Sequence, residues 1–332
     1  MRLLRSLLMA WMVAPMVATV AEPCVTQSQM QPAERDGLVR SAMTLASLTA
    51  ANDADGVKAQ TMPQFVTDFN GIASAIHGAS PHLQGASFVP STVWILDASG
   101  NTSTQDASFF CTLKGAPSQT SFTIPALPPG KYGLAVLDSV GTAEPWQVAL
   151  LLRQSAPGTW QLGGLFPRAT TAAGHDGLWY WNAARGYADK KQPWNAYVYY
   201  TEAEQLLKPV AFVTSSHLDK LYDERGKATP AALSAGLGED KPLVIAGQKG
   251  EIRVTSLGAE PAPDKTAIDV VAHVKSEDAL TDAVASRARN TAAAKAIVAA
   301  YPELRSAFHG VWVVQDLPGG QTYISEEPMT SL

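Results

Sequence analysis

Beyond its first residues, the sequence has no long apolar run and no excess of positive charge. After residue 21, no apolar stretch approaches the roughly 20 residues that a helix needs to cross a bilayer, so we expect no membrane span there. The 25 Lys and Arg residues are outnumbered by 30 Asp and Glu residues, which gives a formal net charge of −5. Nucleic acids and anionic lipids attract proteins with the opposite balance of charge. We therefore expect neither as a partner.

The spacings that mark common catalytic centres are also missing. The chain has no G-x-S-x-G elbow, no H-E-x-x-H helix, no Walker loop and no G-x-G-x-x-G after a strand. This absence lowers the expectation of an enzyme without removing it. Nothing in the sequence indicates a cofactor.

The start of the chain has the pattern of a secretory signal peptide. Arg2 and Arg5 precede an apolar run over residues 7–17, and the small residues Thr19 and Ala21 occupy the −3 and −1 positions of a cleavage site. We expect cleavage after Ala21 and a periplasmic or secreted protein. Loss of the two arginines leaves 23 basic residues against 30 acidic ones, a net charge of about −7.

The sequence has only two cysteines, Cys24 and Cys111. Because paired cysteines of an exported chain are more often bonded than free, we predict a Cys24–Cys111 disulfide, worth about 4 kcal/mol in the chain-entropy model. One alternative is two free thiols, with Cys111 buried in a strand. The other is acylation of Cys24 as a lipoprotein, against which Glu22 and Pro23 argue, since a lipobox places a small residue directly before its cysteine.

The order of periodic segments predicts an α+β, multidomain fold. Helical spacing over residues 33–51 and a second helical pattern are followed, from 91 to 166, by six strand-like segments between Gly- and Pro-containing turns. Helices plus a curved antiparallel sheet are expected in residues 30–168. A helical segment at 174–230 and a small C-terminal α+β domain at 240–332 are expected to follow.

The first domain resembles the NTF2-like superfamily, the cystatin-like α+β cone, over residues 33–168. The resemblance is carried by six apolar residues of two paired strands: Trp146, Leu150, Leu152, Trp160, Leu162 and Leu165. It implies a pocket between helix and sheet that holds a small ligand, or in which Asp and His act as general acid and base. The groups available for such a role are Asp36, Asp68, His77, Asp97 and Asp106. The turn at 127–132 is similar instead to turns of transthyretin-like β-sandwiches.

Residues 177–209 resemble one tetratricopeptide-repeat helical hairpin. Small and aromatic residues occupy its packing positions: Tyr180, Ala183, Ala184, Tyr187, Ala196, Tyr200 and Ala203. The resemblance implies a concave groove faced by Trp181, Arg185 and Asp189 of the first helix. Trp181 and Arg185 are four residues apart, so they can stack or grip a carboxylate. Alternatively, this face packs on a neighbouring domain, because a solitary hairpin needs cover.

In the C-terminal domain we expect strands around one dominant helix. Ser276, followed by Glu277 and Asp278, is predicted to open this alanine-rich helix, which runs to about Ala300. Pro302 is expected to begin a short second helix.

Several polar clusters have a simpler structural explanation than catalysis. Asp176, beside His175, is expected to cap the helix at 177–189. The run of Ser215, Ser216, His217 and Asp219 contains the residue types of a triad, but triads assemble from distant segments, so a solvated helix start is expected.

We also predict no metal site from the sequence. His77 and His82 lack flanking carboxylates or cysteines that would close a site. His309 is expected to be a turn histidine with satisfied hydrogen bonds.

Together these patterns favour an exported, non-catalytic binding or scaffold protein of the cell envelope that acts on a protein or peptide partner. The alternative is a small-ligand carrier or enzyme that uses the pocket of the N-terminal domain.

Overall fold

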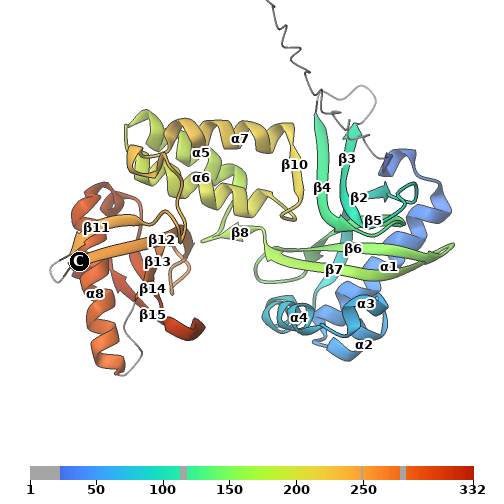
Figure 1. The fold of residues 1–332 in the computed structure, drawn as a ribbon, viewed down its shortest axis with the longest axis horizontal. Helices are drawn as coiled ribbons and strands as arrows, with labels where there is room; N and C mark the ends of the chain where they lie inside the picture. Colours follow the sequence, from blue (N-terminus) through green and yellow to red (C-terminus); the bar gives the residue numbers. More distant parts are fainter. Residues whose placement is uncertain (1–22, 113–117, 248–249, 277–281) are drawn as a thin grey trace, which may run out of the picture.

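The computed structural model describes residues 23–112, 118–247, 250–276 and 282–332. The predicted signal peptide, residues 1–21, lies outside these residues. An N-terminal α+β unit, a helical unit and a C-terminal α+β unit follow one another along the chain, with the helical unit in the middle (Figure 1). The predicted α+β multidomain fold is therefore confirmed. Within the described residues, none of the helices combines the length and apolar character that a membrane span requires.

The N-terminal unit begins with helices and continues with strands. Its helices are α1 (Pro32–Ala50), α2 (Ala54–Ala59), α3 (Pro63–Val66) and α4 (Asn70–Leu83). Its strands are β1 (Cys24–Thr26), β2 (Ser87–Asp97), β3 (Gln105–Thr112), β4 (Gln119–Leu127), β5 (Lys131–Val140), β6 (Trp146–Ala156) and β7 (Thr159–Ala169). All six strand segments expected from the sequence form, but in two sheets. An antiparallel sheet has the order β1-β2-β5-β6-β7, and a second has the order β10-β4-β3.

The two sheets and the helices stack as three layers. Alternate side chains of a strand point to opposite faces, and both faces of the five-stranded sheet are apolar. One face packs on α1 and α4, where Leu45 and Ile76 are fully buried. The other face packs on β3 and β4 through Phe109 and Phe122, which are also fully buried. The β3–β4 pair must leave the main sheet because it covers that second apolar face.

The predicted Cys24–Cys111 disulfide is present. It joins β1 of the first sheet to β3 of the second, with a Cα–Cα distance of 5.3 Å across 87 residues of sequence separation. The bond therefore fastens two layers of the N-terminal unit to each other. A disulfide also fits an exported protein.

Removing this disulfide is predicted to destabilise the N-terminal unit. Cys24→Ser/Cys111→Ser should lower its free energy of unfolding by up to about 4 kcal/mol, because the unfolded chain regains the entropy of an open loop. Urea unfolding of the mature chain, followed by Trp fluorescence, measures the change. Dithiothreitol should shift the wild-type curve toward that of the variant and leave the variant unmoved; coincident wild-type and variant curves would contradict the prediction.

The helical unit contains α5 (Gly177–Asp189), α6 (Pro193–Leu207) and α7 (Ser216–Ala228). The predicted hairpin is present, and Asp176 caps α5 by accepting a hydrogen bond from Trp179 N at 2.8 Å. Two short strands, β8 (Thr171–Ala172) and β9 (His175–Asp176), lead into α5. Between α6 and α7, β10 (Val213–Ser215) pairs with β4, so the helical unit completes the second sheet of the N-terminal unit.

The C-terminal unit is one five-stranded sheet with α8 (Ala283–Ala300) packed on it. The strands, in the order β11-β12-β13-β14-β15, are β11 (Leu243–Gly247), β12 (Gly250–Pro261), β13 (Ile268–Lys275), β14 (Gly310–Asp316) and β15 (Thr322–Pro328). Between β13 and the parallel β14, the chain passes through α8 and the 3₁₀ turn η3 (Pro302–Ser306).

The predicted start of α8 at Ser276 is wrong. Asp282 caps the helix, accepting a hydrogen bond from Val284 N at 2.9 Å. Ser276 N instead bonds Asp316 O at 2.9 Å, which continues the β13–β14 pairing for one residue. Glu277 and Asp278 lie outside the described residues.

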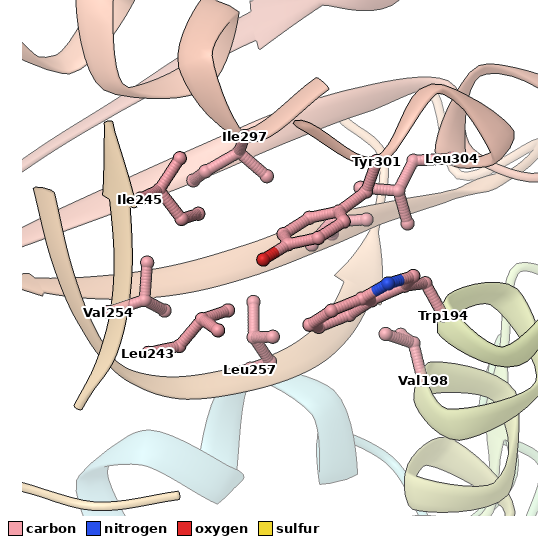
Figure 2. A pocket seen from close by; sticks show the side chains of 10 residues that line it. Trp194, Val198, Leu243, Ile245, Val254, Leu257, Ile297, Tyr301 and Leu304 are labelled. Atoms are coloured by element: carbon pink, nitrogen blue, oxygen red, sulfur yellow. The ribbon is translucent and has the colours of Figure 1, made fainter. Parts of the chain in front are cut away.

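The helical unit and the C-terminal unit share one hydrophobic core. Trp194 of α6 stacks on Tyr301 at 3.7 Å between ring centroids, and Figure 2 shows Trp194 and Val198 facing the aliphatic side chains of β11 and β12. The cavity among these side chains measures about 10 Å³. That is room for a single water at most, in apolar surroundings, so it is a packing gap and not a ligand site.

Glu202 is a carboxyl group buried in the same region. It lies on α6 and is 3% exposed, with no hydrogen-bond partner for Oε2 among the described residues. Burial, followed by the nearby Glu260 carboxylate, raises the pKa of Glu202 to about 8. Tyr180 also faces it, and burial followed by Glu202 raises the pKa of that phenol. Glu202 is therefore protonated in the folded protein at neutral pH.

Glu202 is predicted to make stability fall as pH rises. The folded state keeps this proton up to about pH 8, whereas the unfolded state loses it near pH 4.5. The free energy of unfolding should therefore decrease between these values. Glu202→Gln cannot ionise, so it should match the wild type at pH 5 and exceed it by at least about 2 kcal/mol at pH 9. Guanidinium unfolding at both pH values tests this, with the exposed Glu239→Gln as control; equal gains in both variants would refute the assignment.

Candidate functional site

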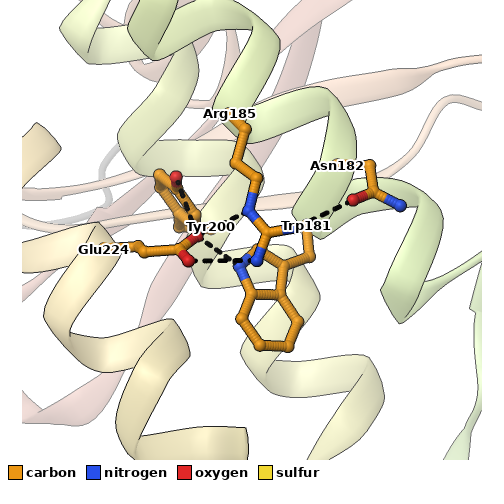
Figure 3. Close-up of polar contacts among 5 residues, drawn as sticks. All are labelled: Trp181, Asn182, Arg185, Tyr200 and Glu224. Carbon is orange, nitrogen blue, oxygen red and sulfur yellow. Dashed lines mark hydrogen bonds and ion pairs between the residues drawn. The ribbon is translucent and has the colours of Figure 1, made fainter.

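The candidate site is a groove between the end of α5 and the C-terminal part of α7. Its volume is about 780 Å³. The lining comes from α5, the α5–α6 turn, α6, and the end of α7 with the residues after it: Arg185, Ala188, Asp189, Lys191, Pro193, Tyr200, Glu224, Lys227, Ala228, Thr229, Pro230 and Ala231. The helices hold these groups because α7 packs on α6 and brings Glu224 to face Arg185 of α5 (Figure 3).

One wall of the groove is a fixed network around Glu224 of α7. Arg185 donates to both carboxylate oxygens, from Nε at 2.7 Å and from Nη2 at 3.0 Å. Trp181 Nε1 donates to the same carboxylate at 2.7 Å, and Tyr200 Oη lies 3.5 Å from it (Figure 3). The Arg185 guanidinium also lies over the Trp181 ring, 4.6 Å from its centroid. A two-pronged ion pair with a stacked ring holds Arg185 in one orientation.

The network shifts the acid–base properties of its members. The hydrogen bonds from Arg185 lower the pKa of Glu224, and those to Glu224 raise the pKa of Arg185. Burial, followed by the Glu224 charge, raises the pKa of Tyr200 to about 12. At neutral pH the network therefore consists of a carboxylate, a guanidinium and a neutral phenol.

The remaining charged groups of the groove are free to meet a partner. Lys191, Lys227 and Asp189 form no ion pair with any residue that the structure describes. All three are exposed. Because Arg185 and Glu224 neutralise each other, the groove carries a local surplus of positive charge in a chain whose net charge is −5.

The structure separates the three residues that the sequence places on one face. Arg185 and Asp189 line the groove. Trp181 is only 7% exposed and lies behind Arg185, against α7. α7 therefore covers the Trp181 end of this face and leaves the Asp189 end open, and a binding role for this face stays a prediction.

Sequence reasoning missed Glu224, Lys191 and Lys227. Glu224 is 39 residues from its partner Arg185, and nothing local in α7 distinguishes it from the other acidic residues of that helix. Lys191 lies in the turn between α5 and α6 and has a positive φ of 59°, two residues before α6 begins. The sequence does not predict this conformation, because a lysine rarely adopts a positive φ.

The candidate acid–base residues of the N-terminal unit do not enter its interior. Asp36, Asp68, His77 and Asp106 are exposed, and Asp97 is half-buried at the end of β2. The layer between the helices and the sheet is filled by apolar side chains, among them Leu38, Leu150, Trp160 and Leu162.

The other polar clusters act as predicted at helix starts. Ser215 caps α7 by accepting from Leu218 N at 3.3 Å, and Asp219 accepts from the Thr214 hydroxyl at 2.7 Å. His175 stacks on Trp179 with ring centroids 3.7 Å apart, while Asp176 makes the cap. His77 bonds Ala73 O through Nδ1 at 2.6 Å.

Comparison of the chain with protein-family models, with curated proteins and with solved structures finds no match. The NTF2-like and tetratricopeptide-like resemblances therefore stay predictions.

Glu224 is predicted to stabilise the wall of the groove. Glu224→Ala should lower the free energy of unfolding by about 2 kcal/mol at pH 7, because it leaves Trp181 Nε1 and Arg185 without their acceptor. Glu224→Gln should cost less. Since the folded pKa of Glu224 is lowered, its contribution is complete above the ordinary value of about 4.3 and is lost as pH falls through the lowered pKa.

Urea unfolding at pH 7 and pH 3 measures both effects. The gap between wild type and Glu224→Gln should be present at pH 7 and smaller at pH 3. Asp223→Asn, an exposed neighbour on the same helix, is the control and should behave as wild type at pH 7. A loss in Asp223→Asn as large as that in Glu224→Gln would show that the helix charge matters and the network does not.

Proposed function

We propose that the protein is an exported, non-catalytic binding or scaffold protein of the cell envelope, and that it binds an acidic peptide segment of a protein partner in the groove between α5 and α7. The observation that supports it is an open groove of about 780 Å³ that is lined by an oriented Arg185 and by Lys191 and Lys227, neither of which forms an ion pair with a described residue. The resemblance of residues 177–209 to a peptide-binding repeat hairpin supports the same proposal.

Preorganisation favours binding at this wall. Glu224 and the Trp181 ring already hold Arg185, so little side-chain entropy is lost when a partner contacts its exposed side. Arginine and aromatic residues are also frequent anchors of protein interfaces. Tyr200, at the base of the groove, adds an aromatic surface beside the guanidinium.

Charge complementarity selects the chemistry of the partner. Lys191 and Lys227 are exposed. Among the residues that line the groove, Asp189 is the one negative charge left once Arg185 and Glu224 have neutralised each other. A segment with carboxylates gains attraction here and would be repelled by most of this acidic chain. An acidic segment is therefore drawn to the groove and away from other surfaces.

The alternative, a small-ligand carrier or enzyme of the NTF2-like type, draws no specific support. Buried apolar side chains fill the layer where that family's pocket is expected. None of the five candidate acidic and histidine groups lies within that layer.

Reversal of the two groove lysines is predicted to abolish partner capture. A photo-crosslinking residue at Ala231, on the exposed rim of the groove, should form an adduct with an envelope protein of the native host. Lys191→Glu/Lys227→Glu should reduce that adduct at least tenfold, because two attractions become repulsions. Mass spectrometry should place the crosslink in an acidic segment.

The matched control is Lys241→Glu/Lys295→Glu, which makes the same change of charge at exposed positions outside the groove. It should leave the adduct intact. An adduct that survives the groove reversal, or that the control removes equally, would refute the proposal.

A further inference from the structure

A second cluster of polar side chains lies in the C-terminal unit, outside the groove. It consists of Asp269 at the start of β13, His309 directly before β14, and Glu326 on β15. His309 Nδ1 is 3.2 Å from Asp269 Oδ1 and 3.8 Å from Glu326 Oε1. One donor atom from each of the three residues lies within 4.8 Å of the other two.

The sheet fixes the backbone of this cluster. His309 N donates to Ile268 O at 3.0 Å, and His309 O accepts from Met329 N at 2.8 Å, so its main chain is held between two neighbouring segments. Gly310 brings the backbone against both carboxylates. A Cβ there would lie 2.7 Å from Glu326 Oε1 and 3.2 Å from Asp269 Oδ1, so glycine alone leaves the carboxylates their positions.

The protein's own groups leave the cluster unsatisfied. Asp269 is fully buried, yet its Oδ2 has no hydrogen-bond partner among the described residues, and neither has Glu326 Oε1. The Trp312 indole and the Gly310 N–H act on the Asp269 carboxylate as nearby donors that favour its charged form, but Trp312 Nε1 makes no hydrogen bond of normal geometry with any described residue. A buried carboxylate oxygen without a partner is costly. It therefore marks a position for something that the chain does not supply.

The electrostatic surroundings favour a cation there. The carboxylates of Asp264 and Glu327 add negative charge close to His309 and Glu326, respectively. Arg287 is the nearby cation, and it lies on Glu327 at 3.5 Å. Glu327 also accepts from Thr291 of α8, so by strand alternation Glu326 lies on the opposite face of the sheet. The three-residue cluster thus keeps a negative surplus on the face away from α8.

We propose that Asp269, His309 and Glu326 bind a divalent transition-metal ion, zinc above all. Donor atoms about 2.0–2.2 Å from a tetrahedral zinc ion are separated by about 3.4 Å. The separations of 3.2 and 3.8 Å at His309 Nδ1 bracket that value. An imidazole with carboxylates suits zinc, whereas calcium and magnesium take oxygen ligands.

The site has an entrance and an open coordination position. The His309 side chain is 40% exposed and that of Glu326 is 19% exposed, while Asp269 lies beneath them. Three protein ligands leave a fourth position to water or to a group from a partner. Bound metal would tie the starts of β13 and β14 to the end of β15. The proposal does not rest on the function proposed for the groove.

Zinc binding to the full mature chain, purified without a histidine tag and stripped with a chelator, tests this proposal. Competition against a fluorescent zinc chelator at pH 7.5 should give one zinc ion per chain. His309→Ala and Glu326→Gln should each weaken the affinity at least tenfold. In the wild type, zinc at a hundredfold excess over its Kd should raise the Tm by about 5 °C, and the two variants should show no such shift.

His273→Ala is the matched control. His273 lies in the same sheet, is also 40% exposed on its side chain, and contacts one carboxylate, Asp316, at 3.1 Å. This variant should bind zinc as the wild type does. Far-UV circular dichroism checks that each variant is folded, and Asp269→Asn, whose side chain is buried, is left out for that reason.

Three outcomes would overturn the proposal. In the first, the wild type does not bind zinc. In the second, His309→Ala and His273→Ala both keep the affinity of the wild type. In the third, both variants lose affinity by the same factor. The first would identify the cluster as a histidine that bonds the Asp269 carboxylate alone.

Discussion

The C-terminal half of the chain depends on the burial of α6 on nearly every side. Its buried residues include aromatic, aliphatic and polar side chains around the whole helix, where a surface helix would show one apolar stripe. α5 and α7 cover part of it, and β12, α8 and η3 cover the rest. Trp194 stacks on Tyr301, and Asn195 Nδ2 donates to Glu303 O at 2.9 Å. The burial of α6 therefore needs the C-terminal unit as well as the other helices of its own unit, and the two units share one hydrophobic core.

The same helix positions both candidate sites. On one side it carries Tyr200 and holds α5 and α7 at the separation that opens the groove. On the other side, Tyr199 Oη donates to Ala307 O at 3.0 Å and the Tyr199 ring meets Phe308 edge-on. These contacts end one residue before His309, whose main chain then bonds to Ile268 and Met329. The imidazole is therefore placed by α6 from one direction and by the sheet from the other, which is the kind of double support that a precise ligand geometry needs.

Local signals in the sequence predicted local structure well. The Asp176 cap, Pro193 at the first turn of α6, the strand segments between 91 and 166, and the cysteine pair all depend on short-range rules or on simple pairing, and all are present. The errors concern partners that are distant in sequence. The β3–β4 pair leaves the main sheet to cover its second apolar face, and β10, some 90 residues later, pairs with β4 there. Ser276 extends the β13–β14 pairing through its N–H bond to Asp316 O, while α8 begins later, after Asp282, and the Glu224 network joins residues 39 positions apart. Asp269, His309 and Glu326 meet only because parallel β13 and β14 and antiparallel β15 have a particular register.

Two groups of buried carboxylates in this half of the protein carry the same desolvation cost. Their geometry decides whether a proton or a metal ion offsets it. Glu202 has another carboxylate and a tyrosine as its electrostatic neighbours, and a single proton removes its charge. In the cluster of Asp269, His309 and Glu326, one proton cannot neutralise both carboxylates. An imidazole proton on His309 Nδ1 can serve Asp269 Oδ1, but Asp269 Oδ2 and Glu326 Oε1 stay without a partner among the described residues. A divalent ion neutralises both carboxylates at once and needs the fixed donor separations that Gly310 and the His309 main chain provide. Burial alone thus marks a group that titrates, whereas burial with several donors at coordination spacing marks a group that binds a metal.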